Sequence, residues 1–172
     1  MFVEKDNMEI VTLGEIKLVG LTLGKLGWQK HGDGGIYAKM WEKYQAEYLP
    51  QVKSVIDPFV GYWFWYNDPA DADGYNYFIG GHVSDFDNVD ENLVTFTIPA
   101  RRYIKHSFNS DDFGKLIDVV LSDSNEKVKQ WADESGYKIV YMSESPTQSI
   151  QVYPKQEFQA EYPSMYTLTP IE

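Results

Sequence analysis

Among the residues of this chain, the aromatic ones have a number and spacing that suggest a binding site. The 172 residues include five Trp, 13 Tyr and nine Phe, which together make up 16% of the sequence. Because a domain of this size needs few tryptophans to fill its core, we expect some of these rings to line a ligand cavity. Indole and phenol faces attract flat organic cations by about 0.5–2 kcal/mol for each desolvated ring.

The densest aromatic run is Phe59–Tyr66, FVGYWFWY. In a strand, alternate side chains share a face, so Trp63 and Trp65 stand on the same face as Gly61. The glycine leaves room above the sheet, and we therefore expect both indoles to line a pocket, joined by Tyr77 from the next run. Plain core packing, or burial in a homodimer, is the alternative explanation for these rings.

A second set of rings recurs at helical spacing. Tyr37, Trp41, Tyr44 and Tyr48 fall at i, i+4, i+7 and i+11, which predicts a helix over Ile36–Leu49 with one aromatic face. Packing against the core is the usual role of such a stripe. Trp41 and Tyr44 are nevertheless candidates for the pocket, because they belong to the same excess of aromatic residues.

Other kinds of site find little support in the sequence. The absence of cysteine excludes disulfides, thiolate zinc sites and a cysteine nucleophile. His31, His82 and His106 lie on separate segments without metal-ligand spacing, so we predict no metal site and no cofactor. The glycines after His31 lack the spacing of a phosphate-binding or dinucleotide-binding loop, and no seryl nucleophile elbow is present.

The composition describes an acidic globular chain. Hydrophobic residues make up 43% and charged residues 24%, and this length suits a single domain spanning 1–172. The formal net charge is −11 and the basic residues are scattered, which argues against direct nucleic-acid binding and favours cationic ligands. Because no leader or membrane span is evident, we expect a soluble, cytoplasmic protein.

Hydrophobic periodicity and turn signals predict the same order of elements twice along the chain, strand, helix, strand, strand. This order predicts an α+β fold of two βαββ repeats, at about residues 8–86 and 93–171, with Asp87–Asn92 as the crossover. A cleft between the two halves would suit a ligand. The remaining predicted elements are strands Glu15–Gly27, Tyr75–Val83, Ala100–Phe108, Ser149–Tyr153 and Met165–Thr169, a helix capped by Ser110–Asp112, and a short helix from Asp123 to Gly136.

Four short motifs occur in the second half of the chain. They are Ile98-Pro-Ala followed by Tyr103, Trp131 followed by Glu134-Ser-Gly-Tyr137, Ile150-Gln-Val-Tyr153, and Tyr166-Thr-Leu-Thr-Pro-Ile171. In this order and spacing they resemble the GyrI-like small-molecule-binding family, the effector-binding domain at the end of some AraC-type and multidrug-responsive regulators. The resemblance covers about residues 8–171.

The resemblance implies a pseudo-two-fold antiparallel sheet, with helices packed on one side and a central groove for lipophilic, often cationic, aromatic compounds. It places Gln151 and Tyr153 in that groove. The family's pocket glutamate falls on Gln151, so the implied partner of a cation is either the glutamine carbonyl or another acid. Glu161, Glu157 and Glu42 remain open as that acid.

A stand-alone binding domain for drug or effector sensing, or for sequestration, is therefore the predicted function. We expect no enzyme activity and no catalytic residues, because the pocket glutamate is missing. Two alternatives stay open, a hydrolase of electrophilic small molecules that uses a carboxylate to direct water, and a module that inhibits a protein partner.

Overall fold

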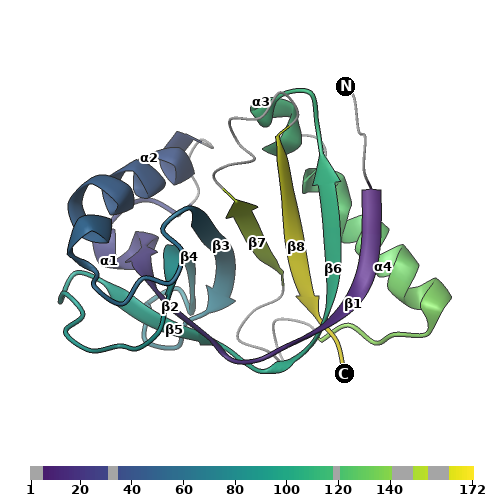
Figure 1. The fold of residues 1–172 in the computed structure, drawn as a ribbon, viewed down its shortest axis with the longest axis horizontal. Helices are drawn as coiled ribbons and strands as arrows, with labels where there is room; N and C mark the ends of the chain where they lie inside the picture. The colour runs from purple at the N-terminus through teal and green to yellow at the C-terminus, as the bar shows by residue number, and fades with distance from the viewer. Residues whose placement is uncertain (1–5, 31–34, 118–120, 141–148, 155–162) are drawn as a thin grey trace.

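The strands form one antiparallel sheet. The computed structural model describes residues 6–30, 35–117, 121–140, 149–154 and 163–172, and within them the strand order is β1-β6-β8-β7-β3-β4-β2-β5 (Figure 1). The strands are β1 (Asp6–Leu13), β2 (Ile16–Thr22), β3 (Val60–Asn67), β4 (Tyr75–Val83), β5 (Val94–Ile98), β6 (Arg101–Asn109), β7 (Ile150–Pro154) and β8 (Ser164–Pro170). The helical segments are α1 (Leu23–Leu26), α2 (Gly35–Lys43), η1 (Tyr44–Tyr48), η2 (Leu49–Gln51), α3 (Phe113–Lys115) and α4 (Leu121–Ser135).

The pairing of β3 with β7 lies in the middle of this sheet and joins its two halves. Gly61 lies opposite Tyr153, and Trp63 lies opposite Gln151. Outward from this seam, the strand order is β3-β4-β2 on one side and β7-β8-β6 on the other. The predicted α+β class with an antiparallel sheet is confirmed, while the pseudo-two-fold relation between repeats stays a prediction.

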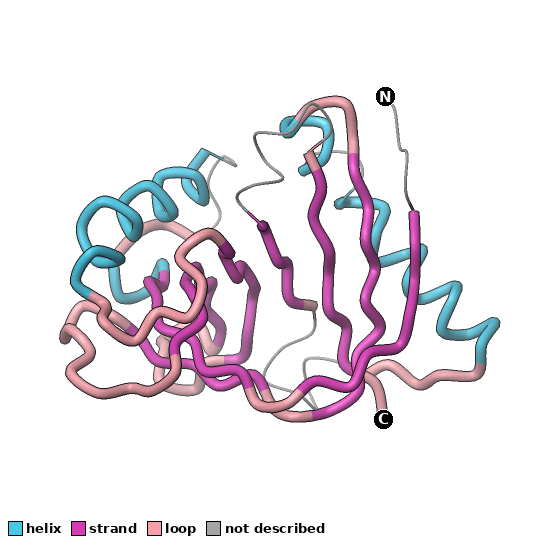
Figure 2. Tube along the Cα trace, in the orientation of Figure 1, coloured by secondary structure: helices cyan, strands magenta, loops and turns pink. Residues whose placement is uncertain are grey.

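The described helices cover one face of the sheet. Residues that pair directly across strands share a face, which places Trp63, Gln151, Thr167 and His106 together. Helix α2 packs on this face through the cluster that contains Trp63, and α4 packs there through residues beside Ile104. In Figure 2, α2 lies towards one end of the row of strands and α4 towards the other.

The opposite face of the sheet is buried by its own curvature. Phe96 of β5 lies 4.9 Å from Phe64 of β3 between ring centroids, although two strands separate β5 from β3 in the sheet order. A flat sheet would place strands three positions apart at about 14 Å. The sheet therefore curls, and Tyr62, Phe64 and Tyr66 are buried on this face as Trp63 is on the other.

The first predicted strand is too long. Strand β2 ends at Thr22, whose side-chain oxygen accepts a hydrogen bond from the backbone N–H of Lys25 at 3.2 Å and begins α1. Gly27, with a φ of 69°, ends that turn of helix in the left-handed conformation. The helical prediction for 36–49 is confirmed in extent, although α2 passes into the π-helical turn η1 at Tyr44.

The prediction of a separate helix that begins at Asp123 is wrong. Helix α4 already includes Leu121 and continues through 123–126, so the capping pattern lies inside it. The hydroxyl of Ser124 faces the sheet and lies 2.8 Å from Nδ1 of His106, in place of a cap. Gly136, with a φ of 78°, follows the helix end as expected.

The two edge strands were not predicted, and one of them changes the crossover. Residues Asp87–Asn92 lead into β5, which pairs with β2, so the chain passes to the second half at Pro99 and Ala100. Strand β1 pairs with β6 at the other edge. The residues of β5, VTFTI, alternate apolar and polar side chains, so the sequence did contain a signal that could have found this strand.

Buried tyrosines predict a loss of stability in alkali. Burial raises the pKa of Tyr44 and Tyr103 from 10.0 to about 12, and Arg101 partly opposes the effect at Tyr103. Because only the folded protein holds these protons so strongly, this stabilisation is complete below pH 10 and is lost as the pH rises towards 12. We expect constant urea midpoints from pH 7 to 9 and falling midpoints above pH 10. Midpoints that stay level to pH 11.5 would contradict the burial of these hydroxyls.

Candidate functional site

The predicted aromatic residues gather in one buried cluster on the helix-bearing face. Five of the predicted site residues belong to it, and each is 9% exposed or less. Trp65 is half-buried and packs against them. The five are Trp41, Tyr44, Trp63, Tyr77 and Tyr153. Their assembly is observed, whereas their part in ligand binding stays a prediction.

Four of these residues meet over the seam between β3 and β7. The ring centroids of Trp63 and Tyr153 lie 4.3 Å apart, and those of Trp41 and Trp63 lie 6.0 Å apart. Trp41 also stacks on Tyr44 at 5.5 Å. We call Trp41, Tyr44, Trp63 and Tyr153 the seam cluster, because rings from both parts of the chain converge there.

A second group of rings continues along the same face from the seam cluster. Trp65 and Tyr77 pair across β3 and β4, with ring centroids 4.8 Å apart. Tyr37 of α2 lies 4.6 Å from Tyr77, and Tyr75 lies 5.8 Å from Trp65. The helical stripe located Tyr37 in the sequence but did not connect it to this strand pair, because only the tertiary structure brings α2 over β4.

Glycines beneath the rings allow the close packing of the seam cluster. A Cβ atom on Gly61 would lie 2.9 Å from Nε1 of Trp63 and 3.0 Å from Cη2 of Trp41. A Cβ atom on Gly81 would lie 3.1 Å from the hydroxyl oxygen of Tyr44. The space predicted above Gly61 therefore exists, but the protein's own rings occupy it.

Two polar atoms of the seam cluster lack a hydrogen-bond partner among the residues that the structure describes. They are the hydroxyl of Tyr44 and the indole Nε1 of Trp63, and both are buried. Tyr153 differs, because its hydroxyl donates a hydrogen bond to Oε1 of Gln151 at 2.6 Å. Burial also raises the pKa of the Tyr153 hydroxyl well above its ordinary value. The cluster thus presents apolar ring faces together with proton donors.

The described residues do not identify a carboxylate that would pair with a bound cation. Glu161 and Glu157 lie outside the described residues. Glu42 is exposed and lines a shallow hollow with Pro58 and Phe59. Gln151 is half-buried beside Tyr153 and carries a neutral carbonyl in the place that the resemblance assigns to a glutamate.

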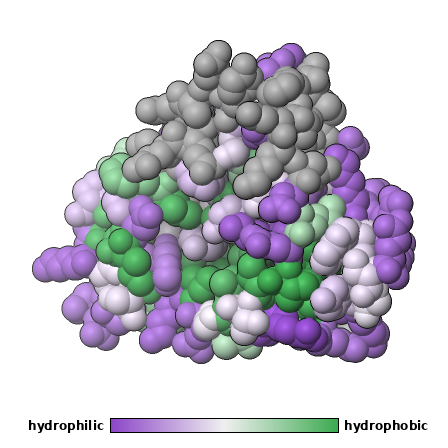
Figure 3. Space-filling model, turned by 45° about the vertical axis from the view of Figure 1, so that its right-hand side comes forward, coloured by the Kyte–Doolittle hydropathy of each residue, from purple (hydrophilic) through white to green (hydrophobic). Residues whose placement is uncertain are grey.

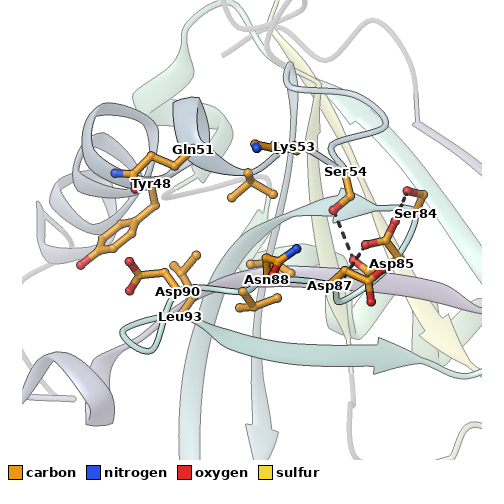
Figure 4. A pocket seen from close by; sticks show the side chains of 13 residues that line it. Tyr48, Gln51, Lys53, Ser54, Ser84, Asp85, Asp87, Asn88, Asp90 and Leu93 are labelled. Carbon is orange, nitrogen blue, oxygen red and sulfur yellow. Dashed lines mark hydrogen bonds between the residues drawn. The ribbon is translucent and has the colours of Figure 1, made fainter.

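A cavity of about 490 Å³ opens beyond the end of α2, and the sequence analysis missed it. Its inner wall includes Val19 and Leu93, which also belong to the aromatic cluster, and its rim carries Asp85, Asp87 and Asp90 (Figure 4). The carboxylate of Asp85 accepts a hydrogen bond from the Ser84 hydroxyl at 3.0 Å. These acidic residues lie in turns, so their sequence pattern predicted only a segment that connects two strands.

The surface carries both hydrophobic and hydrophilic side chains, and the chain has more acidic than basic residues. On the face drawn in Figure 3, hydrophobic side chains gather at the centre and hydrophilic side chains surround them. The formal net charge of −11 creates a potential that attracts cations towards the molecule.

Metal and membrane sites find no support within the residues that the structure describes. There, no group of three or more His, Asp or Glu side chains could hold a metal ion. His31 lies outside the described part, and His106 is buried against Ser124. No helix in the described ranges is long and apolar enough to cross a membrane.

Solved structures share this fold at low sequence identity. SAV2435, in its structure bound to tetraphenylphosphonium, has a TM-score of 0.62 at 12% identity over 96% of this chain and 94% of that one. The C-terminal domain of EcmrR has a TM-score of 0.64 at 18% identity, over 97% and 98%. A hydrolase from Listeria innocua has a TM-score of 0.54 at 11% identity, over 98% and 93%.

The family comparison is more specific than the fold. No curated protein matches the sequence. The model of the family described as integron-associated effector binding protein matches residues 9–167, which is almost the whole chain. This match confirms the predicted resemblance to GyrI-like effector-binding domains. The chain therefore belongs to the family of integron-associated effector binding proteins.

Proposed function

We propose that this chain binds lipophilic aromatic cations at the seam cluster, as a stand-alone domain for sensing or sequestration. The observation that carries the proposal is the convergence of ring faces from α2, η1, β3 and β7 at one place on the sheet. Trp63 is the central residue, because its ring lies 4.3 Å from Tyr153 and 6.0 Å from Trp41.

The energetics of the cluster favour a cation with aromatic groups. Each desolvated ring attracts a cation by about 0.5–2 kcal/mol, and several rings act together here. The excess of 26 acidic over 15 basic residues draws cations towards the protein and disfavours contact with nucleic acid. SAV2435, which shares the fold, has been solved with tetraphenylphosphonium, a lipophilic cation.

Ligand entry must rearrange the seam cluster. Trp63 is 7% exposed and Tyr153 is 1% exposed, so a ligand reaches their faces only when the rings move apart. The environment of the two indoles in the cluster, those of Trp41 and Trp63, would then change. Intrinsic tryptophan fluorescence therefore reports binding directly.

Water activation is not part of the proposal. A hydrolase of the same fold exists, so the fold alone does not exclude an enzyme. Burial raises the pKa of Tyr153, and its hydroxyl already donates a hydrogen bond to Oε1 of Gln151. A hydroxyl that holds its proton at neutral pH cannot serve as a general base, and we therefore propose a binding protein.

Replacing Trp63 tests the site. We expect Trp63→Ala to weaken the binding of tetraphenylphosphonium about tenfold or more, because the central ring face is removed. Fluorescence quenching of the remaining tryptophans, or calorimetry, measures the affinity. Circular dichroism checks that the variant is folded.

Two control variants separate this site from other places. Trp131→Ala removes an indole that stacks on Tyr137 beside α4, far along the sheet order from the seam. Asp87→Asn removes one charge from the rim of the 490 Å³ cavity. Both controls should bind as the unaltered protein does. An affinity that falls in Asp87→Asn but not in Trp63→Ala would place the ligand in that cavity.

The sign of the ligand's charge is a separate prediction. Tetraphenylphosphonium and tetraphenylborate have nearly the same shape and opposite charge. Because ring faces and an acidic surface both favour positive charge, we expect saturable binding and a raised melting temperature with the phosphonium only. Equal responses to both ions would show that burial of apolar surface alone drives binding.

A further inference from the structure

The two unpaired polar atoms of the seam cluster need a partner. Trp63 is 7% exposed and Tyr44 is fully buried, and within the described ranges neither the indole Nε1 nor the hydroxyl has a hydrogen-bond partner. Leaving a buried donor unpaired costs stability, and native proteins contain few such groups. Two of them in one cluster call for an explanation in terms of what the cluster binds.

Both atoms stand over glycines on neighbouring strands. Nε1 of Trp63 lies above Gly61 of β3, and the hydroxyl of Tyr44 lies above Gly81 of β4. Tyr62 pairs with Gly80, and Gly61 and Gly81 are the next residues along the two strands. Each donor therefore stands over a glycine of this part of the sheet, where no side chain rises beneath it.

The chemistry of these atoms specifies what their partner must be. An indole N–H donates a hydrogen bond and cannot accept one. The Tyr44 hydroxyl, whose pKa burial raises to about 12, keeps its proton and can donate to the same acceptor, although it can also accept a hydrogen bond. Tyr153, the neighbouring hydroxyl, already donates to Gln151. No residue in the described part of the chain pairs with either atom, so an acceptor arrives with the ligand or as water.

We propose that the seam cluster selects aromatic cations that also carry a hydrogen-bond acceptor, such as a carbonyl oxygen, bound by Nε1 of Trp63 and the hydroxyl of Tyr44. This inference rests on the proposed function and adds a specificity to it. The ring faces bind the aromatic cation, and the two hydrogen-bond donors discriminate between cations with and without an acceptor. A site with buried donors discriminates strongly, because a ligand without an acceptor leaves them unpaired.

Two phosphonium ions of matched shape test this selectivity. The (4-acetylbenzyl)triphenylphosphonium ion carries a carbonyl oxygen where the (4-isopropenylbenzyl)triphenylphosphonium ion carries a methylene group. We expect the unaltered protein to bind the acetyl compound about five- to tenfold more tightly, the value of one or two new hydrogen bonds. In Tyr44→Phe and in Trp63→Phe, that ratio of affinities should fall towards one, whatever the absolute affinities.

The outcomes distinguish the two proposals. If both ions bind the unaltered protein equally, the proposed function stands and the acceptor inference is overturned. A preference for the acetyl compound that persists undiminished in both variants also overturns it, because other groups would then bind the carbonyl. If neither ion binds, the proposed function fails and this inference fails with it.

Stability of the empty protein provides a second test, which also detects a bound water. Tyr103, on the opposite face, donates its hydroxyl to the backbone oxygen of Pro99 at 2.6 Å. Tyr103→Phe should therefore lower the melting temperature by about 2–4 °C, whereas Tyr44→Phe should leave it unchanged or raise it. An equal loss in Tyr44→Phe would show that a water or protein group already pairs with that hydroxyl, and would overturn the inference.

Discussion

The antiparallel pairing of β3 with β7 is the constraint on which the rest of this molecule depends. It sets Gly61 opposite Tyr153 and Trp63 opposite Gln151, and these four positions come from segments about 90 residues apart in the chain. Side chains that face each other across such a ladder lie close together without any further adjustment. The helix-bearing face above this seam is therefore the place where residues of the early and late parts of the chain meet.

Burial of both sheet faces follows from how the strands are covered. Helices α2 and α4 cover one face, while the curl of the sheet buries Phe64 against Phe96 on the other. This double burial explains why β3 carries aromatic residues at consecutive positions, since neither face meets water. It also means that the ring density is partly a property of the core. The unpaired Nε1 of Trp63 and hydroxyl of Tyr44 are what distinguish the seam cluster from core packing alone.

The seam cluster has opposite effects on the stability of the fold. Close packing over Gly61 stabilises the fold, whereas two unpaired donors reduce that stability. Proteins tolerate such local costs mainly where a ligand removes them. Gln151, held by the Tyr153 hydroxyl, contributes no charge, so in the proposed complex the attraction of a cation would come from the ring faces and the acidic surface.

The sequence by itself determined the fold class, most strand positions, the one-sided aromatic helix and most of the rings of the buried aromatic cluster, because alternation and helical spacing are local properties. Its four late motifs also identified the family. The edge strands β1 and β5 were not predicted, although the residues of β5, VTFTI, alternate. Nor was the turn of helix at Thr22, whose capping bond forms within an apolar run. Only the tertiary structure decided that the rings fill the space above Gly61, that the hydroxyl of Tyr153 is paired and that of Tyr44 is not. These features depend on the register between strands and on how closely α2 and η1 approach the sheet. Contacts between residues that are distant in the chain determine both.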